Sequence, residues 1–478
     1  MKLPQSIASK LGIAATLLTF STPLLAVSVD VTVETLDDNA LGLASNCDDL
    51  ATPVSCPSLR DAIAFSEQVL TDGADSFVIT LPSGNLTLNQ GPLMIQGREV
   101  TIQAPEDSST TIDGNGERIM EVSLYTTGGA DGQNYQNSKL SLTRLNLING
   151  SAPAGEDGGA ILTDKVLIIK EALLQNNQAN SGNGGAIAVS GDNIDVTIED
   201  SVIKNNSAVN GGFIVTDIGY QGRLTIERTG IVNNIASDLG GAIYSIDGEV
   251  TLKNVTVASN TWNLEIVNNG GIYLNGPIEA IQNNDNLFQF STITDTVLAG
   301  EDKKINIINT IITDCIMHPS VLVDDQEGNL SLSGNHCGIN EAGALNQIVA
   351  SFEELGLGNL NEELGFYPLV SGSPAIDHAN PVMLSGLDQL TGPSGPVRPW
   401  DGDGDGDEDE DIGAIEFGVP NRNINSDLNS GNESSGGCSL NQAKTIEMPY
   451  FTLLLSLSLA GFVFNFRKAT LRKKDILS

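Results

Sequence analysis

One short phrase recurs through the middle of this 478-residue chain, between residues 140 and 275. Each copy has an alternating apolar run, an asparagine, a bend of small residues and then a Gly-Gly pair. The asparagines of the first four copies lie 27, 29 and 28 residues apart. A fixed period of this length indicates stacked structural units. Because the runs alternate with period two and carry Val, Ile and Leu, they predict strands, so each copy is one coil of a solenoid.

Each coil can bury its apolar inward face only by stacking on the next coil, with strands paired in parallel. Neighbouring coils then lie about 4.8 Å apart, so residues at one place in the repeat form a column. We predict that Asn149, Asn176, Asn205 and Asn233 form such a column and link their side-chain amides. The Gly-Gly pairs are expected at sharp turns, where glycine reaches dihedrals that other residues avoid. Structure thus accounts for these residues without a ligand.

Both ends of the chain carry targeting signals. Residues 1–26 have the basic start, apolar middle and small-residue end of a secretory signal peptide. Residues 448–466 form 19 positions without a charge, followed by a basic tail at 467–478. This stretch is long enough to span a bilayer, and its basic flank is expected to stay in the cytoplasm. We therefore predict export across the inner membrane and anchoring by one C-terminal transmembrane helix.

Between these ends the chain divides into four parts. An N-terminal cap is expected at 27–76, with one strand and a short helix from Ser58, because an open solenoid end exposes a bare strand edge. The coils of the β-helix follow at 77–344 and number about ten at the repeat length seen here. A C-terminal cap is expected at 345–418. A flexible linker with a sorting motif is expected at 419–447, which is rich in Asn, Ser and Gly.

Composition limits the classes of partner. The formal net charge of −37 excludes a nucleic-acid partner, because both molecules would be strongly negative. With 40% hydrophobic residues, the chain also has ample apolar surface for a core, unlike a disordered acidic segment. We therefore expect a folded all-β body with an acidic surface.

Several motifs are similar to those of a known family. The segment CPSLRDAIAF resembles the CSLREA-type motif that opens many secreted bacterial right-handed parallel β-helix proteins of the pectate-lyase-like superfamily. The N-x-A and GGAI repeats resemble the body of those proteins, and SPAID, VRPWDGDGDGD and DIGAIE are similar to the choice-of-anchor Q domain. The resemblance covers nearly the whole chain. It implies an all-β, right-handed parallel β-helix solenoid with a cap at each end.

The C-terminal end resembles a GlyGly-CTERM sorting tag, with Gly436, Gly437 and Cys438 ahead of the apolar stretch. This resemblance implies cleavage by a sorting protease at the membrane, followed by transfer to the cell surface or secretion. Two positions depart from the family patterns. Ala379 stands where the Q domain usually has glycine, and Cys438 lies inside the tag, which leaves lipidation of that cysteine open.

Five cysteines in an exported chain indicate two disulfides and one spare thiol. The predicted pairs, each closing a short loop, are Cys47–Cys56 and Cys315–Cys337. Zinc is the alternative at the second pair, since Cys315, His318, His336 and Cys337 have roughly zinc-like spacing. The oxidising compartment favours the disulfide.

The acidic run from residue 401 to 411 is the strongest metal signal in the sequence. Carboxylates at alternate positions, with glycines between them, let a loop curl around one hard cation. The run opens like an EF-hand loop but has Ile412 where that loop needs glutamate. We therefore predict calcium in a non-EF-hand loop that stiffens the cap, with a merely solvated acidic turn as the alternative. The predicted ligands are Asp401, Asp403, Asp405, Asp407 and Asp409.

No catalytic residue can be assigned from the sequence. The three histidines are not near a convincing nucleophile, so a hydrolase triad has little support. Aligning the coils places Arg144, Glu171, Asp200 and Arg228 in one column. Such a column can act as acid and base, or hold calcium and a uronate, but a ladder of opposite charges on neighbouring strands explains it better. Two tryptophans and no aromatic row argue against a carbohydrate platform.

We therefore predict a non-enzymatic surface protein, either an adhesin or a structural element, whose partner is a carbohydrate or a host or neighbouring surface. The alternative is a carbohydrate-active β-helix enzyme, a polysaccharide lyase or hydrolase, that acts on acidic polysaccharide. The first function predicts no acid–base pocket. The second predicts a groove in which carboxylates and a base converge.

Overall fold

A computed structural model describes most of the chain. The described residues are 27–38, 42–68, 74–96, 99–123, 139–191, 193–217, 222–263, 270–275, 285–334, 336–381, 388–389, 398–399, 401, 404 and 409–418. The predicted signal peptide, linker, sorting motif with Gly436, Gly437 and Cys438, membrane helix and basic tail lie outside them. Among the described residues, no helix has the length and apolarity needed to cross a membrane.

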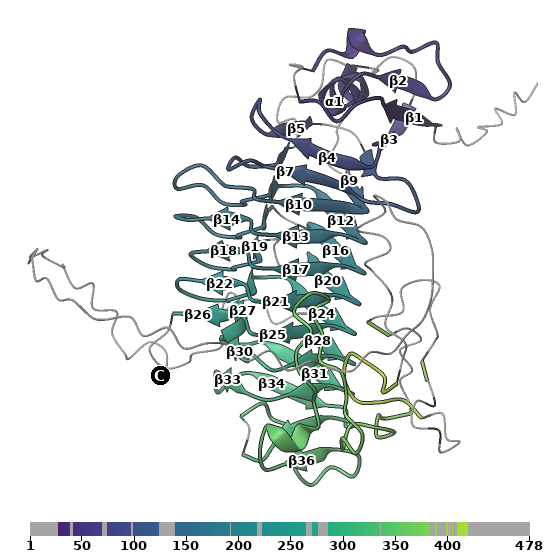
Figure 1. Cartoon of the computed structure of the whole chain (residues 1–478). Helices are drawn as coiled ribbons and strands as arrows, with labels where there is room; N and C mark the ends of the chain where they lie inside the picture. The colour runs from purple at the N-terminus through teal and green to yellow at the C-terminus, as the bar shows by residue number, and fades with distance from the viewer. Residues whose placement is uncertain are drawn as a thin grey trace, which may run out of the picture.

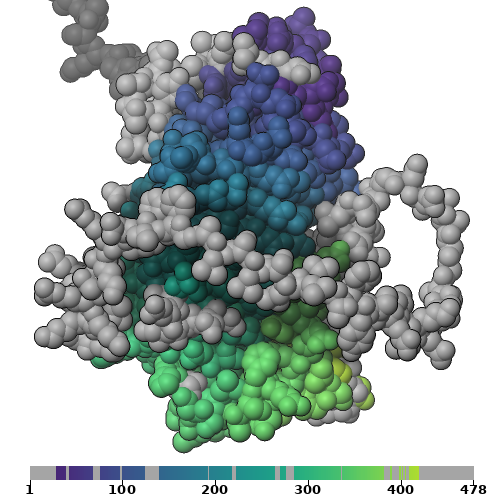
Figure 2. Space-filling model, turned by 60° about the vertical axis from the view of Figure 1, so that its left-hand side comes forward, coloured from purple at the N-terminus to yellow at the C-terminus, as the bar shows by residue number. Residues whose placement is uncertain are grey.

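The described chain is mostly β-structure, and its strands stack in parallel along one axis (Figure 1). In the space-filling view the colours follow one another along the body in chain order (Figure 2). Sheet A runs in the order β2 (Val54–Cys56), β1 (Val27–Val33), β3 (Ala74–Thr80), β6 (Glu99–Gln103), β9 (Lys139–Thr143), β12 (Val166–Lys170), β16 (Asp195–Glu199), β20 (Arg223–Glu227), β24 (Glu249–Lys253), β28 (Asp285–Gln289), β31 (Lys304–Ile308) and β34 (Leu322–Asp325).

Sheets B and C run alongside sheet A. Sheet B contains β4 (Gly84–Thr87), β7 (Thr110–Asp113), β10 (Leu145–Ile148), β13 (Leu173–Gln175), β17 (Val202–Lys204), β21 (Gly230–Val232), β25 (Thr256–Ala258), β29 (Thr292–Ile293), β32 (Ile311–Ile312), β35 (Leu330–Leu332) and β36 (Gln347–Val349). Sheet C contains β5 (Leu93–Gln96), β8 (Met120–Ser123), β11 (Ile161–Thr163), β15 (Ile187–Ser190), β19 (Ile214–Asp217), β23 (Ile243–Ile246), β27 (Gly270–Asn275), β30 (Thr296–Ala299) and β33 (Cys315–Met317). A short sheet D contains β14 (Gln178–Ala179), β18 (Ser207–Ala208), β22 (Ile235–Ala236) and β26 (Thr261–Trp262).

The chain passes from sheet A to sheet B to sheet C once in each coil, and then returns to sheet A one strand further along. Within the described ranges, nine coils contribute a strand to all three sheets. The paired strands of these sheets are parallel, as the register of β12 with β9 and β16 illustrates. This arrangement is consistent with the predicted parallel β-helix.

Period-two alternation explains why the strands close around one core. In β16, Val196 and Ile198 are fully buried while Asp195, Thr197 and Glu199 face outward. In sheet A, Val196 stacks between Leu167 of the preceding coil and Leu224 of the following one, both also fully buried. Each such side chain contributes roughly 1.5–3 kcal/mol when it leaves water, so the core is a continuous apolar column shared by all coils.

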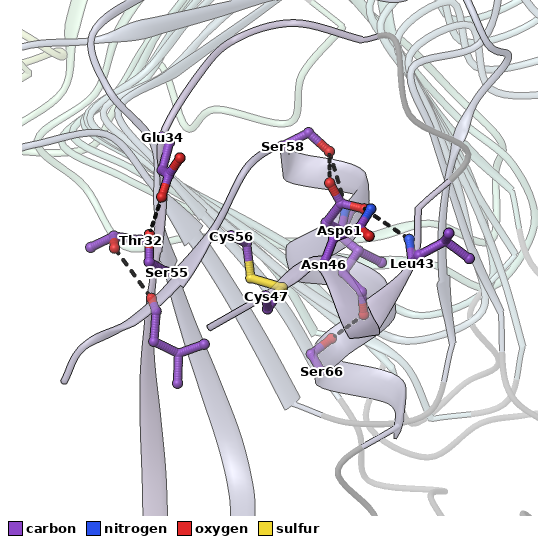
Figure 3. Close-up of a disulfide and its surroundings, with 12 residues drawn as sticks. Thr32, Glu34, Leu43, Asn46, Cys47, Ser55, Cys56, Ser58, Asp61 and Ser66 are labelled. Carbon is purple, nitrogen blue, oxygen red and sulfur yellow. Dashed lines mark hydrogen bonds between the residues drawn. A yellow bond between two sulfur atoms is a disulfide. The ribbon is translucent and has the colours of Figure 1, made fainter. Parts of the chain in front are cut away.

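A short helix covers the N-terminal end of the stack (Figure 1). This helix, α1 (Leu59–Gln68), follows β2, and the Cys47–Cys56 disulfide joins the residue after the 3-10 turn η1 (Ala44–Asn46) to the end of β2, as predicted. Figure 3 shows the buried Asp61 beside this bond. Its carboxylate accepts hydrogen bonds from Leu43 N, Asn46 Nδ2 and Ser58 Oγ, while Ser58 Oγ accepts one from Asp61 N. Ser58 therefore caps the helix as its sequence position suggested.

The second predicted disulfide, Cys315–Cys337, is also present, and both cysteines are buried. Their sulfurs bond to each other, so the zinc alternative at this pair is wrong. His318 has other partners: its Nδ1 lies 2.9 Å from Ser320 Oγ and its Nε2 lies 3.5 Å from a Glu301 carboxylate oxygen.

After β36 the chain turns back along the outer face of sheet B. We call the described residues from 353 to 418 the return arm; it begins with the 3-10 turn η2 (Glu353–Leu355). In Figure 1 its light green trace reaches back beside β21 and β24. Leu355, Leu369 and Ile412 pack with Ile311 of sheet B in one buried cluster. The arm, which lies within the range predicted as the C-terminal cap, thus covers one side of the later coils.

The amide column exists, but it is formed by Asn177, Asn206, Asn234 and Asn260, the first three of which directly follow a predicted asparagine. Gly150 follows Asn149, and its backbone N–H donates to Asn177 Oδ1 at 2.8 Å. Oδ1 of Asn206 accepts from Asn177 Nδ2 at 3.0 Å, and Asn206 Nδ2 donates to Asn234 Oδ1 at 2.9 Å. The same contact joins Asn234 to Asn260 at 2.9 Å. All four side chains of this ladder are fully buried.

The predicted residues Asn149, Asn176, Asn205 and Asn233 instead take positive φ values of 55–59°. Asparagine tolerates this left-handed conformation better than most residues. The first three side chains are exposed to solvent and the fourth is partly buried. In the pairs 176–177, 205–206 and 233–234, the first asparagine therefore makes the turn and the second one links the coils.

Asp295 ends the ladder. One of its carboxylate oxygens accepts from both Asn260 N at 2.9 Å and Asn260 Nδ2 at 2.7 Å. Burial raises the pKa of Asp295 to about 6, although the hydrogen bonds from Asn260 and Ser259 act in the opposite direction. A carboxylate suits this place because it accepts from the coil before it and has no amide to donate onward.

The two asparagines of one pair should differ in their effect on stability. Asn206→Ala should lower the free energy of unfolding by about 3 kcal/mol, because each buried partner left unsatisfied costs roughly 1–3 kcal/mol. Asn205→Gly is the matched control and should change it by less than about 1 kcal/mol, since glycine accepts positive φ. Denaturant unfolding followed by circular dichroism measures both values. Equal losses for the two variants would contradict the assignment of the ladder to Asn206.

Asp295 should make stability depend on pH. Because its pKa is about 6 in the folded chain and 3.8 ordinarily, the folded state binds this proton more tightly. The resulting stability is fully present below about pH 4 and is lost as the pH rises through about 6. The unfolding free energy of the wild type minus that of Asp295→Asn should therefore fall over this window and then level off. A difference that stays constant from pH 4 to 7 would rule this out.

A charged column and a groove on sheet B

Four charged residues stand at equivalent corners between sheets A and B. Arg144, Glu171, Asp200 and Arg228 each directly follow the last strand residue in sheet A and take φ values of 57°, 52°, 51° and 47°. The structure therefore brings the aligned sequence positions into one column on successive coils. A non-glycine residue in this conformation turns the chain sharply, so each of these corners makes the same bend.

Arg228 binds three carboxylates. Its Nε and Nη2 meet the two oxygens of Asp200 at 2.8 and 3.1 Å, its Nη1 meets Glu227 at 2.9 Å, and its Nη2 also meets Glu199 at 3.2 Å. The side chains of Arg228 and Asp200 are only 9% and 8% exposed. Burial by itself disfavours the charge on Arg228, but the hydrogen bonds to Asp200 and Glu227 outweigh it and raise the pKa of Arg228 above its ordinary value.

Arg144 binds backbone oxygens in the loop between β6 and β7. Its Nε and Nη2 donate to the carbonyl oxygen of Ala104 at 3.2 and 2.9 Å, and Nε also lies 3.0 Å from the Pro105 oxygen. Its Nη1 lies 3.8 Å from a Glu171 oxygen. The column therefore consists of acids and bases that neutralise one another along the stack.

A groove of about 270 Å³ lies beside this column on the outer face of sheet B. The segment 106–109 bounds one part of it, and Glu363 and Leu364 of the return arm bound another. Leu173 and Val202, which stack on each other in sheet B, contribute apolar side chains to its lining. From the segment 106–109 the lining residues are Glu106, Ser108 and Ser109. The remaining residues that line it are Arg144, Asn146, Glu171, Ala172, Asp200 and Lys204.

Lys204 connects the groove to the return arm. Its Nζ donates to the backbone oxygen of Glu363 at 3.3 Å. Burial lowers the pKa of Lys204, while the nearby carboxylates of Glu363 and Glu362 act in the opposite direction. The contact joins residues 159 positions apart in sequence, so no local sequence pattern could have indicated it.

This geometry does not have the form of an acid–base pair. The carboxylates of Asp200 and Glu171 both face arginines of the same column. A general acid and a general base need environments that drive their pKa values apart, whereas here the acids share cationic partners. The arrangement matches the ladder of opposite charges that the sequence favoured.

The predicted calcium ligands are only partly described. Asp403, Asp405 and Asp407 lie outside the described residues, and Asp401 accepts a hydrogen bond from Gly404 N at 2.7 Å. Among the described residues, no three metal-binding side chains converge. Calcium at this loop stays a prediction.

Sequence reasoning missed a pair of stacked tyrosines on the outer face of sheet C. The rings of Tyr244 and Tyr273 lie 5.0 Å apart with 30° between their planes. Burial raises the pKa of both hydroxyls. The signal was available, because each tyrosine follows an isoleucine shortly after a Gly-Gly pair. Two rings on paired strands do not form a long row, however.

Comparison with known proteins gives a partial match. The chain is 28% identical over 224 residues to a protein of Escherichia coli (strain K12) described as the probable autotransporter YfaL. The aligned part covers 42% of this chain but only 17% of that protein. No family model matches the chain, and no solved structure gives a significant match.

The buried network of Arg228 should stabilise the fold more than an exposed ion pair does. Arg228→Gln should lower the free energy of unfolding by about 3 kcal/mol, because it leaves largely buried carboxylates without their cation. Arg223→Gln is the control: that side chain is 66% exposed and meets Glu249 at 3.6 Å, so its loss should cost less than about 1 kcal/mol. Chemical denaturation compares the two variants. Similar losses would mean that the network contributes no more than a surface pair.

Proposed function

We propose that this chain is an exported surface protein whose long β-helix serves adhesion or surface structure without catalysis. The observation that carries the proposal is the charged column. Glu171 and Asp200, the acids that alignment of the coils offered as acid–base candidates, are bound by Arg144 and Arg228. A stack of coils with neutralised corners provides a long, stiff surface.

Export is supported by several independent features. The predicted signal peptide and the apolar C-terminal stretch with its basic flank are features of the sequence. Both disulfides of the structure suit an oxidising compartment outside the cytoplasm. The partly matching relative is described as a probable autotransporter. We propose that a sorting protease acts at the membrane and that the β-helix then stays at the surface or is secreted.

The partner is proposed to be a carbohydrate or the surface of a host or neighbouring cell. The net charge of −37 favours partners that are neutral or cationic. The alternative function, cleavage of an acidic polysaccharide, is not supported by the paired acids of the column. Such an enzyme would also have to bind an acidic substrate despite its own strongly negative charge, and like charges repel.

Two measurements on the full-length chain test this proposal. Cells that display the protein should adhere to a test surface at least tenfold more than cells that lack it. The second measurement compares the purified wild type with the double variant Glu171→Gln and Asp200→Asn. The purified protein should release no ultraviolet-absorbing unsaturated product from pectate or alginate. Product formation that disappears in the double variant would overturn the non-catalytic function.

A further inference from the structure

The groove and the return arm share one face of sheet B. The outward column of this sheet runs in register through Asn146, Leu173, Val202, Gly230, Thr256 and Thr292. From Gly230 onward the arm covers it. A Cβ added to Gly230 would lie 2.4 Å from the Gly365 oxygen, Thr256 Oγ1 donates to Gln389 Oε1 at 2.7 Å, and Ala414 N donates to Thr292 Oγ1 at 3.1 Å.

As far as the chain is described, the arm ends where the groove begins. Leu364, which lines the groove, packs against Phe366, Ala414 and Ile415 of the arm itself. The next two positions of the sheet B column, Val202 and Leu173, are partly exposed and line the groove. The face that binds the protein's own chain over the later coils therefore continues in the same register beyond the tip of the arm, where Leu173 and Val202 make it apolar.

The size of the groove limits its occupant. Small-molecule sites typically measure about 300–1,000 Å³, and this groove measures about 270 Å³. It accommodates an apolar side chain on Leu173 and Val202 more readily than a long oligosaccharide, for which stacked aromatic rings would be expected. The arm shows that polypeptide backbone can lie on the adjoining part of the face, where Gly365 meets Gly230.

The charges around the groove define the flanking chemistry. Four carboxylates line it, those of Glu106, Glu171, Asp200 and Glu363, against the two cations Arg144 and Lys204. Arg144 is directed to the oxygens of Ala104 and Pro105, and Lys204 to that of Glu363. Glu106 is exposed at the edge. Because Arg144 and Arg228 bind Glu171 and Asp200, the negative charge of the rim comes mainly from the exposed Glu106 and Glu363, and it complements a basic side chain.

We propose that this groove is a docking site for an extended peptide segment of another protein, which places an apolar side chain on Leu173 and Val202 and a Lys or Arg against the rim. The peptide occupies the part of the sheet B face that adjoins the return arm. This inference deepens the proposed surface function, on which it rests, by giving the chemistry of the partner.

A peptide selection tests the proposal on the immobilised full-length chain. Phage displaying random heptapeptides are the probe. Enriched sequences should share an apolar residue with Lys or Arg within two positions, and a synthetic peptide of that type should bind at least tenfold more weakly to Val202→Arg. Ile235→Arg is the matched control, since Ile235 is 54% exposed on sheet D and does not line the groove; it should bind as the wild type does.

A second variant covers the case in which Val202→Arg does not fold. Glu106→Lys changes an exposed residue at the rim and should weaken the basic peptide at least threefold, whereas Glu117→Lys, exposed and not lining the groove, should not. Raising the salt concentration should weaken binding further. No enrichment, enrichment of acidic or wholly polar peptides, or equal binding to the folded groove variants would overturn the proposal.

The two proposals can fail separately. Adhesion that survives in Val202→Arg, together with a failed peptide selection, removes the docking site and leaves the surface function in place. Binding of a glycan array that is lost in the groove variants would assign the groove to carbohydrate instead of peptide. Release of an unsaturated polysaccharide product would remove the non-catalytic function itself.

Discussion

The structure depends on one constraint: successive coils must stay in register at the spacing of a single parallel sheet. The buried amide ladder enforces this at the corner that follows sheet B. Each of Asn177, Asn206 and Asn234 uses its Oδ1 to accept from the coil before it and its Nδ2 to donate to the coil after it. The backbone N–H of each asparagine joins the same ladder by donating to the next side chain. A coil displaced by one residue would bury all of these groups unsatisfied, which is costly.

Glycine has a matching role at the corner before sheet C. A Cβ on Gly185 would lie 2.1 Å from the Gly212 oxygen, and one on Gly212 would lie 2.1 Å from the Gly241 oxygen. The coils therefore pass closer here than any side chain permits. A second, more exposed ladder precedes these glycines, in which Asn183 donates to Asp157 and accepts from Asn210. The recurring phrase of the sequence thus encodes two stacking corners in each coil.

The β-helix could be predicted from the sequence repeat, because equivalent residues of every coil lie in nearly the same environment. It could not show which asparagine of a pair faces inward, since both are asparagine and differ only in backbone conformation. The cysteine pairs were predictable because each closes a short loop. The return arm was not: residues 353–418 do not repeat, and their contacts with sheet B join positions such as Thr256 and Gln389, 133 residues apart. The groove depends on that arm, so it could not be predicted either.

In-register stacking also explains the pattern of charges. Parallel coils place equivalent residues side by side, so a repeated acid would stack like charges. In sheet A this is avoided where Arg223 pairs in register with both Asp195 and Glu249. Glu199 and Glu227 are in register as like charges, and Arg228 binds both of them together with Asp200. In a chain with 60 acidic and 23 basic residues, cations placed in this way hold the corners together. At the rim of the groove, Glu106 and Glu363 lie outside this network, and both are exposed to whatever approaches the uncovered part of sheet B.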